Sequence, residues 1–428
     1  MNREDTQAAQ QVVTQLAQGD FAAVEQRLAG NIRQQLPAER LQATWQALET
    51  QVGSFKEQLG AHTFQAQSTE MIIVTCAFAM VNLDVNVSFN SAGEISGLTI
   101  TPVGSVEQQL TSSYEPPAYV KLDSFKEQEV QVGQGEWVLP GILSMPVGKG
   151  PFAAVVLIQG SGPHDWDETI GPNKPFRDLA WGLASQGIAV LRYDKRTKVY
   201  GAKIQDLMAT FTVKEETIDD ALAAVALLRR NAQVNPQQIM VLGHSLGGYL
   251  LPRIGATDPG IAGLIMLAGM TRKLEDTILD QYTYIFSLSG TLSAEQQQQL
   301  EELKKQVARV KDPALSLSTP AAELPLGVPP AYWLDLRDYQ PAIMAQGLPQ
   351  PMLILQGESD YQVTMEDFQG WNDALGTRSN VQFKSYPGLY HLFMPVEGGG
   401  KATPAAYNVA GHVVVEVVVD IAHWIKQH

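Results

Sequence analysis

The chain contains a serine, an aspartate and a histidine in sequence settings that together suit nucleophilic catalysis. Gly243-His244-Ser245-Leu246-Gly247 is a G-x-S-x-G sequence, and Asp360 and His391 each follow a predicted strand further along the chain. A serine hydroxyl needs a base to take its proton, and the base needs a carboxylate to orient it. The pattern predicts Ser245 as nucleophile, His391 as base and Asp360 as the orienting acid.

The residues around Ser245 predict how its hydroxyl is presented. An apolar run, 238–242, precedes the G-x-S-x-G sequence, and a helix-compatible segment, 248–251, follows it. This context predicts a sharp strand-to-helix turn that exposes the serine, with glycines where side chains would collide with neighbouring elements. The N–H of Leu246, at the start of the helix, is predicted to point at a developing oxyanion.

The acid and the base each have a competitor in the sequence. Glu358 lies close to Asp360 after the predicted strand 352–356. His164 precedes the serine, whereas the order Ser, Asp or Glu, His places the base last. The other histidines lie in the N-terminal region, beside the serine, or on or at the end of a predicted final helix: His62, His244, His412, His423 and His428. His391, on the loop after the predicted strand 381–386, therefore remains as the base.

A glycine-rich loop, 159–165, follows the predicted strand 152–159. Its small residues would let the backbone approach a carbonyl oxygen closely, so a second oxyanion donor is expected here. The N–H of Ser161 is the best candidate by position, with Gly160 and Gly162 as alternatives.

The charged segment 192–196 follows a predicted core strand. We interpret it as structural, holding the loop that carries Asp165, Asp167 and Glu168 by ion pairs, in preference to a role in substrate binding.

From residue 119 onward the pattern predicts α/β architecture. An opening antiparallel pair is followed by alternating strands and helices, which favours a doubly wound, mostly parallel sheet. The predicted helices are 175–185, 213–231, 246–254, 365–375 and 405–426. Domain 119–428 is interrupted by a predicted helical cap insertion at about 271–350.

Within this insertion, Ser293 and Gln296 form a capping-box pattern that begins an amphipathic helix, 294–311. Tyr332 and Trp333 belong to a group of cap aromatics that either line an acyl pocket or bury the cap against the sheet. With Gly160 and His164 they are the candidate substrate-binding residues.

Residues 1–101 predict a separate, small α+β domain. Helical spacing over 6–18, 21–28 and 38–52 gives way to strand patterns over 61–101, including a single strand at 71–83. A hairpin turn is expected at 90–93, and residues 102–118 are predicted to be a linker.

Composition excludes several classes of function. The net charge of −15 makes nucleic acid an improbable partner. No apolar run is long enough to span a bilayer, and the N-terminus lacks the apolar core of a signal peptide. The compartment stays open at this stage, and both a cytoplasmic protein and one exported with a leader absent from this sequence fit the pattern. The single Cys76 excludes an intrachain disulfide and a cysteine-based zinc site, and we expect it to be a buried packing residue. No nucleotide-binding or H-E-x-x-H motif occurs, so neither a cofactor nor a metal is predicted.

Together, three motifs resemble the α/β-hydrolase superfamily and, within it, the EstD-like group of bacterial carboxylesterases. They are 157–163 (LIQGSGP), 192–196 (RYDKR) and 243–248 (GHSLGG). Members of this group often carry an extra N-terminal domain that is NTF2-like or cystatin-like, and residues 5–101 are similar to it in length and order. The resemblance implies a serine esterase for short- to medium-chain acyl esters, with Ser245, Asp360 and His391 as its triad.

Two other functions remain open at this point. A serine peptidase, an amidase or an acyltransferase can use the same scaffold, and a peptidase would need a group for a charged peptide end, for which Arg272, Arg309 and Arg337 are candidates. A binding protein with a degenerate hydrolase domain is disfavoured by the intact serine, aspartate and histidine. The N-terminal domain shows no catalytic cluster, so a structural or homodimerising role is expected for it.

Overall fold

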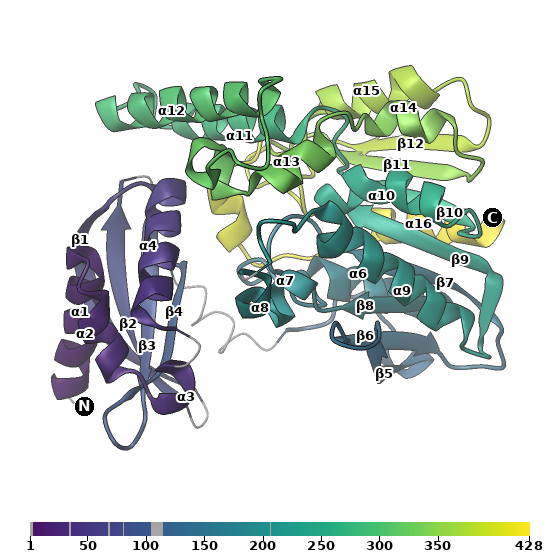
Figure 1. The fold of residues 1–428 in the computed structure, drawn as a ribbon. Helices are drawn as coiled ribbons and strands as arrows, with labels where there is room; N and C mark the ends of the chain where they lie inside the picture. The colour runs from purple at the N-terminus through teal and green to yellow at the C-terminus, as the bar shows by residue number, and fades with distance from the viewer. Residues whose placement is uncertain (1–2, 34–35, 67–68, 80, 104–113, 206) are drawn as a thin grey trace. The chain divides into compact units, whose positions relative to one another are not determined.

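The computed structural model describes residues 3–33, 36–66, 69–79, 81–103, 114–205 and 207–428 (Figure 1). The chain divides into two compact units. The first contains Met1–Tyr114 with two short segments of the predicted insertion, Thr291–Leu303 and Ala322–Gly327, and the second contains the remainder. Residues 104–113 of the predicted linker lie outside the described residues.

The first unit is built from helices followed by an antiparallel sheet. Its elements up to residue 103 are α1 (Arg3–Gln18), α2 (Phe21–Arg27), α3 (Gly30–Arg33), α4 (Ala38–Val52), β1 (Phe55–Ala66), β2 (Thr69–Phe78), β3 (Asn82–Phe89) and β4 (Ile95–Pro102). The strands pair in the order β1-β2-β3-β4, and each pair is antiparallel. The predicted helix-then-sheet order is confirmed. The single strand predicted at 71–83 is wrong, because the Phe78 N–H bonds to the Val81 carbonyl and closes a turn between β2 and β3.

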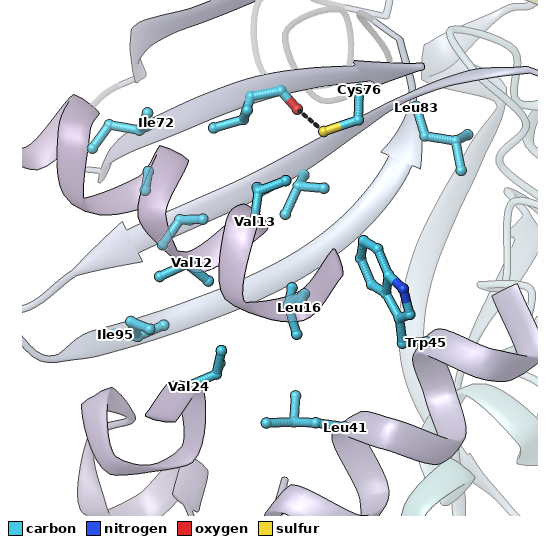
Figure 2. Close-up of a cluster of buried hydrophobic side chains, with 14 of the residues drawn as sticks. Val12, Val13, Leu16, Val24, Leu41, Trp45, Ile72, Cys76, Leu83 and Ile95 are labelled. Carbon is cyan, nitrogen blue, oxygen red and sulfur yellow. Dashed lines mark hydrogen bonds between the residues drawn. The ribbon is translucent and has the colours of Figure 1, made fainter. Parts of the chain in front are cut away.

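Alternate residues of β2 form the core of this unit with the helices (Figure 2). Ile72, Val74 and Cys76 point to the same face of the sheet, since side chains alternate along a strand, and Trp45 of α4 belongs to the same cluster. Cys76 is fully buried, and burial raises the pKa of its thiol to about 12. The prediction that Cys76 is a packing residue is confirmed.

The second unit contains an eight-stranded, mostly parallel sheet in the order β12-β11-β10-β9-β7-β8-β6-β5. The strands are β5 (Phe125–Val132), β6 (Leu139–Pro146), β7 (Phe152–Ile158), β8 (Ala189–Tyr193), β9 (Val234–His244), β10 (Gly263–Leu267), β11 (Met352–Gly357) and β12 (Val381–Tyr386). Strands β5 and β6 form the predicted antiparallel opening, and the others run parallel. Every residue of β8, β10 and β11 is buried, as expected for strands with both faces covered. The predicted fold class is confirmed.

Helices cover this sheet, as Figure 1 shows for α6 and α9. The longer ones are α6 (Pro175–Ala184), α9 (Asp219–Arg229), α10 (Leu246–Thr257), α15 (Met365–Leu375) and α16 (Val415–Gln427). Two short helices, α7 (Arg196–Val199) and α8 (Gly201–Gln205), follow β8, and a π-helical turn, Lys214–Ile218, leads into α9.

The final helix predicted at 405–426 begins ten residues later than expected, at Val415. The segment before α16 is held by one side chain of α6 and by one side chain of the loop that precedes α6. The Gly411 N–H donates to Asn173 Oδ1 (2.8 Å), and the Val413 N–H donates to Asp178 Oδ2 (2.9 Å). These backbone donors are therefore satisfied without a helix. His412 precedes α16 and does not lie on it.

Four helices lie in the chain between β10 and β11, where the insertion was predicted. They are α11 (Leu274–Ser287), α12 (Ala294–Lys311), α13 (Pro330–Leu336) and α14 (Pro341–Gln346). The capping box at the start of α12 is confirmed, since the Gln296 N–H donates to Ser293 Oγ (3.1 Å) and the Ser293 N–H donates to Gln296 Oε1 (3.0 Å).

The order of the strands identifies where a ligand is expected. Strand β7 has β8 on one side and β9 on the other, so the chain reverses direction across the sheet at β7. Ligands of such sheets bind outside the carboxyl ends of the strands at this switch point. A ligand is therefore expected beside the loop after β7 and the residues after β9, near the ends of β11 and β12 at the same edge.

Candidate active site

Ser245 lies in a strained turn between β9 and α10. Its φ of 53° and ψ of −116° are unusual for a residue with a side chain. The conformation is fixed because the Ser245 N–H donates to the Leu267 carbonyl of the adjacent strand (2.9 Å). The predicted strand-turn-helix context of the G-x-S-x-G sequence is confirmed.

The two outer glycines of this sequence have no room for a side chain. A Cβ on Gly243 would lie 2.4 Å from the Gly247 carbonyl carbon, and a Cβ on Gly247 would lie 2.4 Å from the Ile158 carbonyl oxygen. Both clashes are with backbone, which cannot swing aside as a side chain can. The tight approach also brings the end of β7 against the start of α10.

Asp360 and His391 form a short contact at the ends of β11 and β12. Asp360 Oδ2 lies 2.6 Å from His391 Nδ1, and both residues are buried. Asp360 Oδ1 accepts the N–H groups of Gln362 (2.7 Å) and Val363 (3.2 Å), so the carboxylate is held in place. Glu358, the competing acid, is exposed and its Oε1 accepts a hydrogen bond from Ser385 Oγ (2.7 Å).

His244 connects the histidine loop to the serine turn. Its Nε2 lies 2.9 Å from the carbonyl oxygen of His391, and the two imidazole rings are 4.5 Å apart. Because His244 immediately precedes Ser245, the structure brings the three predicted triad residues into one region. Their catalytic roles remain predictions.

The loop after β7 lies against Ser245. A Cβ on Gly160 would be only 3.1 Å from Ser245 Cβ. The Gly160 N–H donates to Glu168 Oε1 (2.6 Å), so this alternative donor already has an acceptor. In the described part of the chain, the Ser161 N–H has no acceptor. Ser161 therefore keeps the donor that the prediction requires, and Leu246 opens α10, where the first N–H groups lack intrahelical acceptors.

His164 closes the same loop. Its Nε2 donates to the Ser161 carbonyl oxygen (2.6 Å). Burial lowers the pKa of His164, an effect that the nearby Glu168 carboxylate opposes only in part. A neutral imidazole that donates from Nε2 fits this position, and contact with substrate stays a prediction.

The sequence assigned Glu168 only to a loop held by ion pairs, but its carboxylate contacts both the loop after β7 and the residue before Ser245. Besides accepting from Gly160, it places Oε2 3.0 Å from His244 Nδ1. Burial alone would lower the pKa of His244, but the Glu168 carboxylate raises it overall. Burial would likewise raise the pKa of Glu168, and His244 lowers it overall. Each side chain thus favours the charged form of the other, next to the serine turn.

The charged segment after β8 contacts this loop as well. Arg192 Nε donates to Asp167 Oδ1 (3.0 Å), which confirms the predicted ion pair. Lys195 makes contacts that were not predicted, because its Nζ donates to the Gly160 carbonyl (2.6 Å) and lies 2.7 Å from Glu216 Oε1. Sequence spacing gives no sign of either partner, since Gly160 and Glu216 belong to other elements.

The two candidate substrate-binding aromatics of α13 are buried. Tyr332 donates from its hydroxyl to Glu216 Oε2 (2.7 Å), and Trp333 donates from Nε1 to the Val328 carbonyl (3.1 Å). Their polar atoms are thus bonded within the protein. A role in lining an acyl pocket remains a prediction.

The residues that the structure describes offer neither a metal site nor a membrane-spanning helix. No group of three or more His, Cys, Asp or Glu side chains among them is arranged to hold a metal ion. None of the helices described is both long and apolar enough to cross a membrane.

Comparison with known proteins gives two family matches. Residues 151–397 match the family described as "Serine aminopeptidase, S33", and residues 9–98 match one described as "Protein of unknown function (DUF3887)". The chain is 37% identical to Esterase EstD of Thermotoga maritima over 413 residues, which cover 96% of this chain and 93% of that protein.

Among solved structures, Est1E from Butyrivibrio proteoclasticus is 16% identical, with a TM-score of 0.44, over 71% of this chain and 99% of that one. Pyrococcus horikoshii acylaminoacyl peptidase is 17% identical, with a TM-score of 0.44, over 78% of this chain and 46% of that one.

Proposed function

Because the chain belongs to the α/β-hydrolase family described as serine aminopeptidase S33, we propose that it is a serine carboxylesterase for short- to medium-chain acyl esters. The observation that carries the proposal is the 2.6 Å contact between Asp360 Oδ2 and His391 Nδ1 beside the strained Ser245 turn. The 37% identity to an esterase over nearly the whole chain favours an ester as the substrate.

The proposed reaction begins with attack of Ser245 Oγ on the ester carbonyl carbon. Asp360 accepts a hydrogen bond from the Nδ1–H of His391, so Nε2 of the neutral imidazole is free to take the serine proton. The N–H groups of Leu246 and Ser161 stabilise the oxyanion of the tetrahedral intermediate. His391 then protonates the departing alcohol, and a water molecule, activated by the same histidine, hydrolyses the acyl-enzyme.

We propose that the insertion between β10 and β11 forms a cap near this site. Tyr284 of α11 stacks on Tyr361, the residue after Asp360, with ring centroids 5.1 Å apart, and its hydroxyl donates to the Ala402 carbonyl (2.8 Å). These contacts support a cap beside the acid loop. The proposed acyl range rests on the family resemblance.

A peptidase or amidase is the second candidate, because the matching family is described as a serine aminopeptidase. Such an enzyme needs a free charged group for the peptide end. Arg272 of the insertion is bonded to Asp367 (2.9 Å), and Arg309 lies 3.0 Å from Asp312. Arg337 donates to the Asp312 carbonyl (3.1 Å). These existing partners favour the esterase over the peptidase.

For the N-terminal unit we propose a structural or homodimerising role. Its family match is to a protein of unknown function, and its core holds buried apolar residues in the usual manner of a folded domain. Light scattering of the full chain at several concentrations tests the dimer. A mass that stays at one chain would reject it.

The function is tested by labelling with a fluorophosphonate probe and by hydrolysis of p-nitrophenyl esters from acetate to palmitate. Wild type is compared with Ser245→Ala, and Ser287→Ala, an exposed serine of α11, is the matched control. We expect labelling and turnover in wild type and the control, and neither in Ser245→Ala. Turnover that persists in Ser245→Ala would refute the nucleophile. Labelling without ester turnover, followed by cleavage of aminoacyl amides, would establish the peptidase instead.

A further inference from the structure

Both polar backbone groups of Gly160 are bound by buried charged side chains of opposite sign. The Gly160 N–H donates to Glu168 Oε1 and the Gly160 carbonyl accepts from Lys195 Nζ, each at 2.6 Å. Glu168 is 1% exposed and Lys195 is 2% exposed. Burying either charge is costly unless it is paired.

Each of these charges has a second partner that keeps it in place. Lys195 Nζ lies 2.7 Å from Glu216 Oε1, and Glu216 in turn accepts the Tyr332 hydroxyl. Glu168 Oε2 lies 3.0 Å from His244 Nδ1. The two ion pairs therefore anchor the Gly160 loop to the π-helical turn before α9 and to the serine turn.

The hydrogen bond from Lys195 Nζ to the Gly160 carbonyl also fixes the direction of the Ser161 N–H. The Gly160 carbonyl and the Ser161 N–H belong to one planar, trans peptide group, in which they point in opposite directions. Drawing the carbonyl towards Lys195 consequently turns the Ser161 N–H away from Lys195. That N–H has no acceptor in the described part of the chain, and Gly160 packs against Ser245.

We propose that Lys195 and Glu168 are positioning residues that hold the Gly160 peptide groups so that the Ser161 N–H serves as an oxyanion donor. This inference rests on the proposed esterase function. Without Lys195 the peptide group between Gly160 and Ser161 can rotate, since glycine permits backbone conformations that other residues resist. Neither side chain touches the substrate, and each acts through the backbone of Gly160.

The strained backbone of Glu168 is consistent with this role. Glu168 has a φ of 51°, in the left-handed region that residues with side chains seldom adopt. Such strain persists only where surrounding contacts over-determine it, and it concentrates at functional sites. Here the contacts are those that Glu168 makes with Gly160 and His244.

The experiment compares Lys195→Met with wild type on a p-nitrophenyl oxyester and on the matching thionoester, in which sulfur replaces the carbonyl oxygen. Sulfur is a weak hydrogen-bond acceptor, so an intact oxyanion site favours the oxyester. We expect kcat/KM for the oxyester to fall by about 10²–10³, as for loss of one oxyanion donor, and the oxyester-to-thionoester ratio to collapse. Lys198→Met, which changes an exposed lysine of α7, is the control and should keep the wild-type ratio.

A purely structural role for Lys195 would lower both rates together and preserve the ratio, and that result would overturn the proposal. An oxyester rate unchanged in Lys195→Met would overturn it as well. If wild type hydrolyses neither ester, the proposed function itself fails, which this design distinguishes from a failure of the positioning role.

Lys195→Met leaves the buried Glu216 carboxylate without its cation, so the variant can be unstable. The double variant Lys195→Met/Glu216→Gln removes both charges and provides a second test with the same readout. A folded double variant with a collapsed ratio supports the proposal, and one with the wild-type ratio rejects it. If circular dichroism shows that neither variant folds, the pair is structural and the positioning role is rejected.

Discussion

His244 Nε2 lies 2.9 Å from the carbonyl oxygen of His391, so the residue before the proposed nucleophile is bonded to the proposed base. On its other side His244 Nδ1 faces Glu168, which accepts the Gly160 N–H. One imidazole thus joins the serine turn, the histidine loop and the loop after β7. The three loops come from β9, β12 and β7, and their relative positions depend on this buried side chain as well as on the sheet.

The Glu168–His244 pair should make stability depend on pH. The pKa of His244 is raised in the folded protein, so its stabilising contribution is complete below its ordinary value of about 6.5 and is lost as the pH rises through the folded value. We expect the free energy of unfolding of wild type, relative to His244→Gln, to decline from pH 6 to pH 9. Urea denaturation across this range measures the difference.

His423→Gln, an exposed histidine of α16, is the matched control for that experiment. Its pH profile should parallel that of wild type. Subtraction between variants also removes the contribution of His412, whose pKa is raised by its hydrogen bond to Asp178. Parallel profiles for wild type and His244→Gln would show that folding leaves the pKa of His244 unchanged, which would contradict the pairing with Glu168.

The acid of the proposed triad is tested by Asp360→Asn. An amide at this position cannot stabilise the imidazolium that forms on His391 and favours the wrong tautomer, so kcat should fall by about 10³–10⁴. Glu358→Gln provides the control because Glu358 is exposed and bonded to Ser385. We expect its ester hydrolysis to remain within a few-fold of wild type. A larger loss in Glu358→Gln than in Asp360→Asn would exchange the two assignments.

The sequence was sufficient to predict where Ser245, Asp360 and His391 lie, because each follows a strand whose apolar pattern is plain and whose carboxyl end falls at one edge of a parallel sheet. The outer glycines were predictable for the same reason, since a strand that turns directly into a helix leaves no room for side chains. These features depend on local pattern and on the general rules of α/β sheets.

The roles of Glu168 and Lys195 could not be predicted in this way. Glu168 pairs with His244 and Lys195 with Glu216, across loops whose conformations the apolar pattern does not determine. The sequence offers several carboxylates near each of these basic side chains, and only the folded structure shows which one each side chain contacts. The start of α16 was missed for a related reason, because its upstream N–H groups are bonded to Asn173 and Asp178, more than 230 positions earlier.

Gly247→Ala should damage both stability and activity. The new Cβ would lie 2.4 Å from the Ile158 carbonyl oxygen, so β7 and α10 must separate, at a cost of about 1–3 kcal/mol. Gly201→Ala, whose Cβ would meet nothing within 4 Å, is the control and should be close to neutral. Urea midpoints and ester hydrolysis of both variants test this. Equal stability of the two would mean that the turn relaxes without cost.

Tyr332→Phe separates a structural role for this tyrosine from a substrate-binding one. Its hydroxyl donates to Glu216 Oε2, and burial, together with the neighbouring Glu216 carboxylate, raises its pKa far above the ordinary value. Removing the hydroxyl leaves a buried carboxylate oxygen without a donor, so we expect the free energy of unfolding to fall by about 1–3 kcal/mol with little change in KM. Tyr200→Phe, which loses a hydroxyl bonded to the Val138 carbonyl instead, is the comparison and should be less destabilising because no charged partner is left unpaired. An increase in KM that grows with acyl chain length, at unchanged stability, would instead place Tyr332 in the acyl pocket.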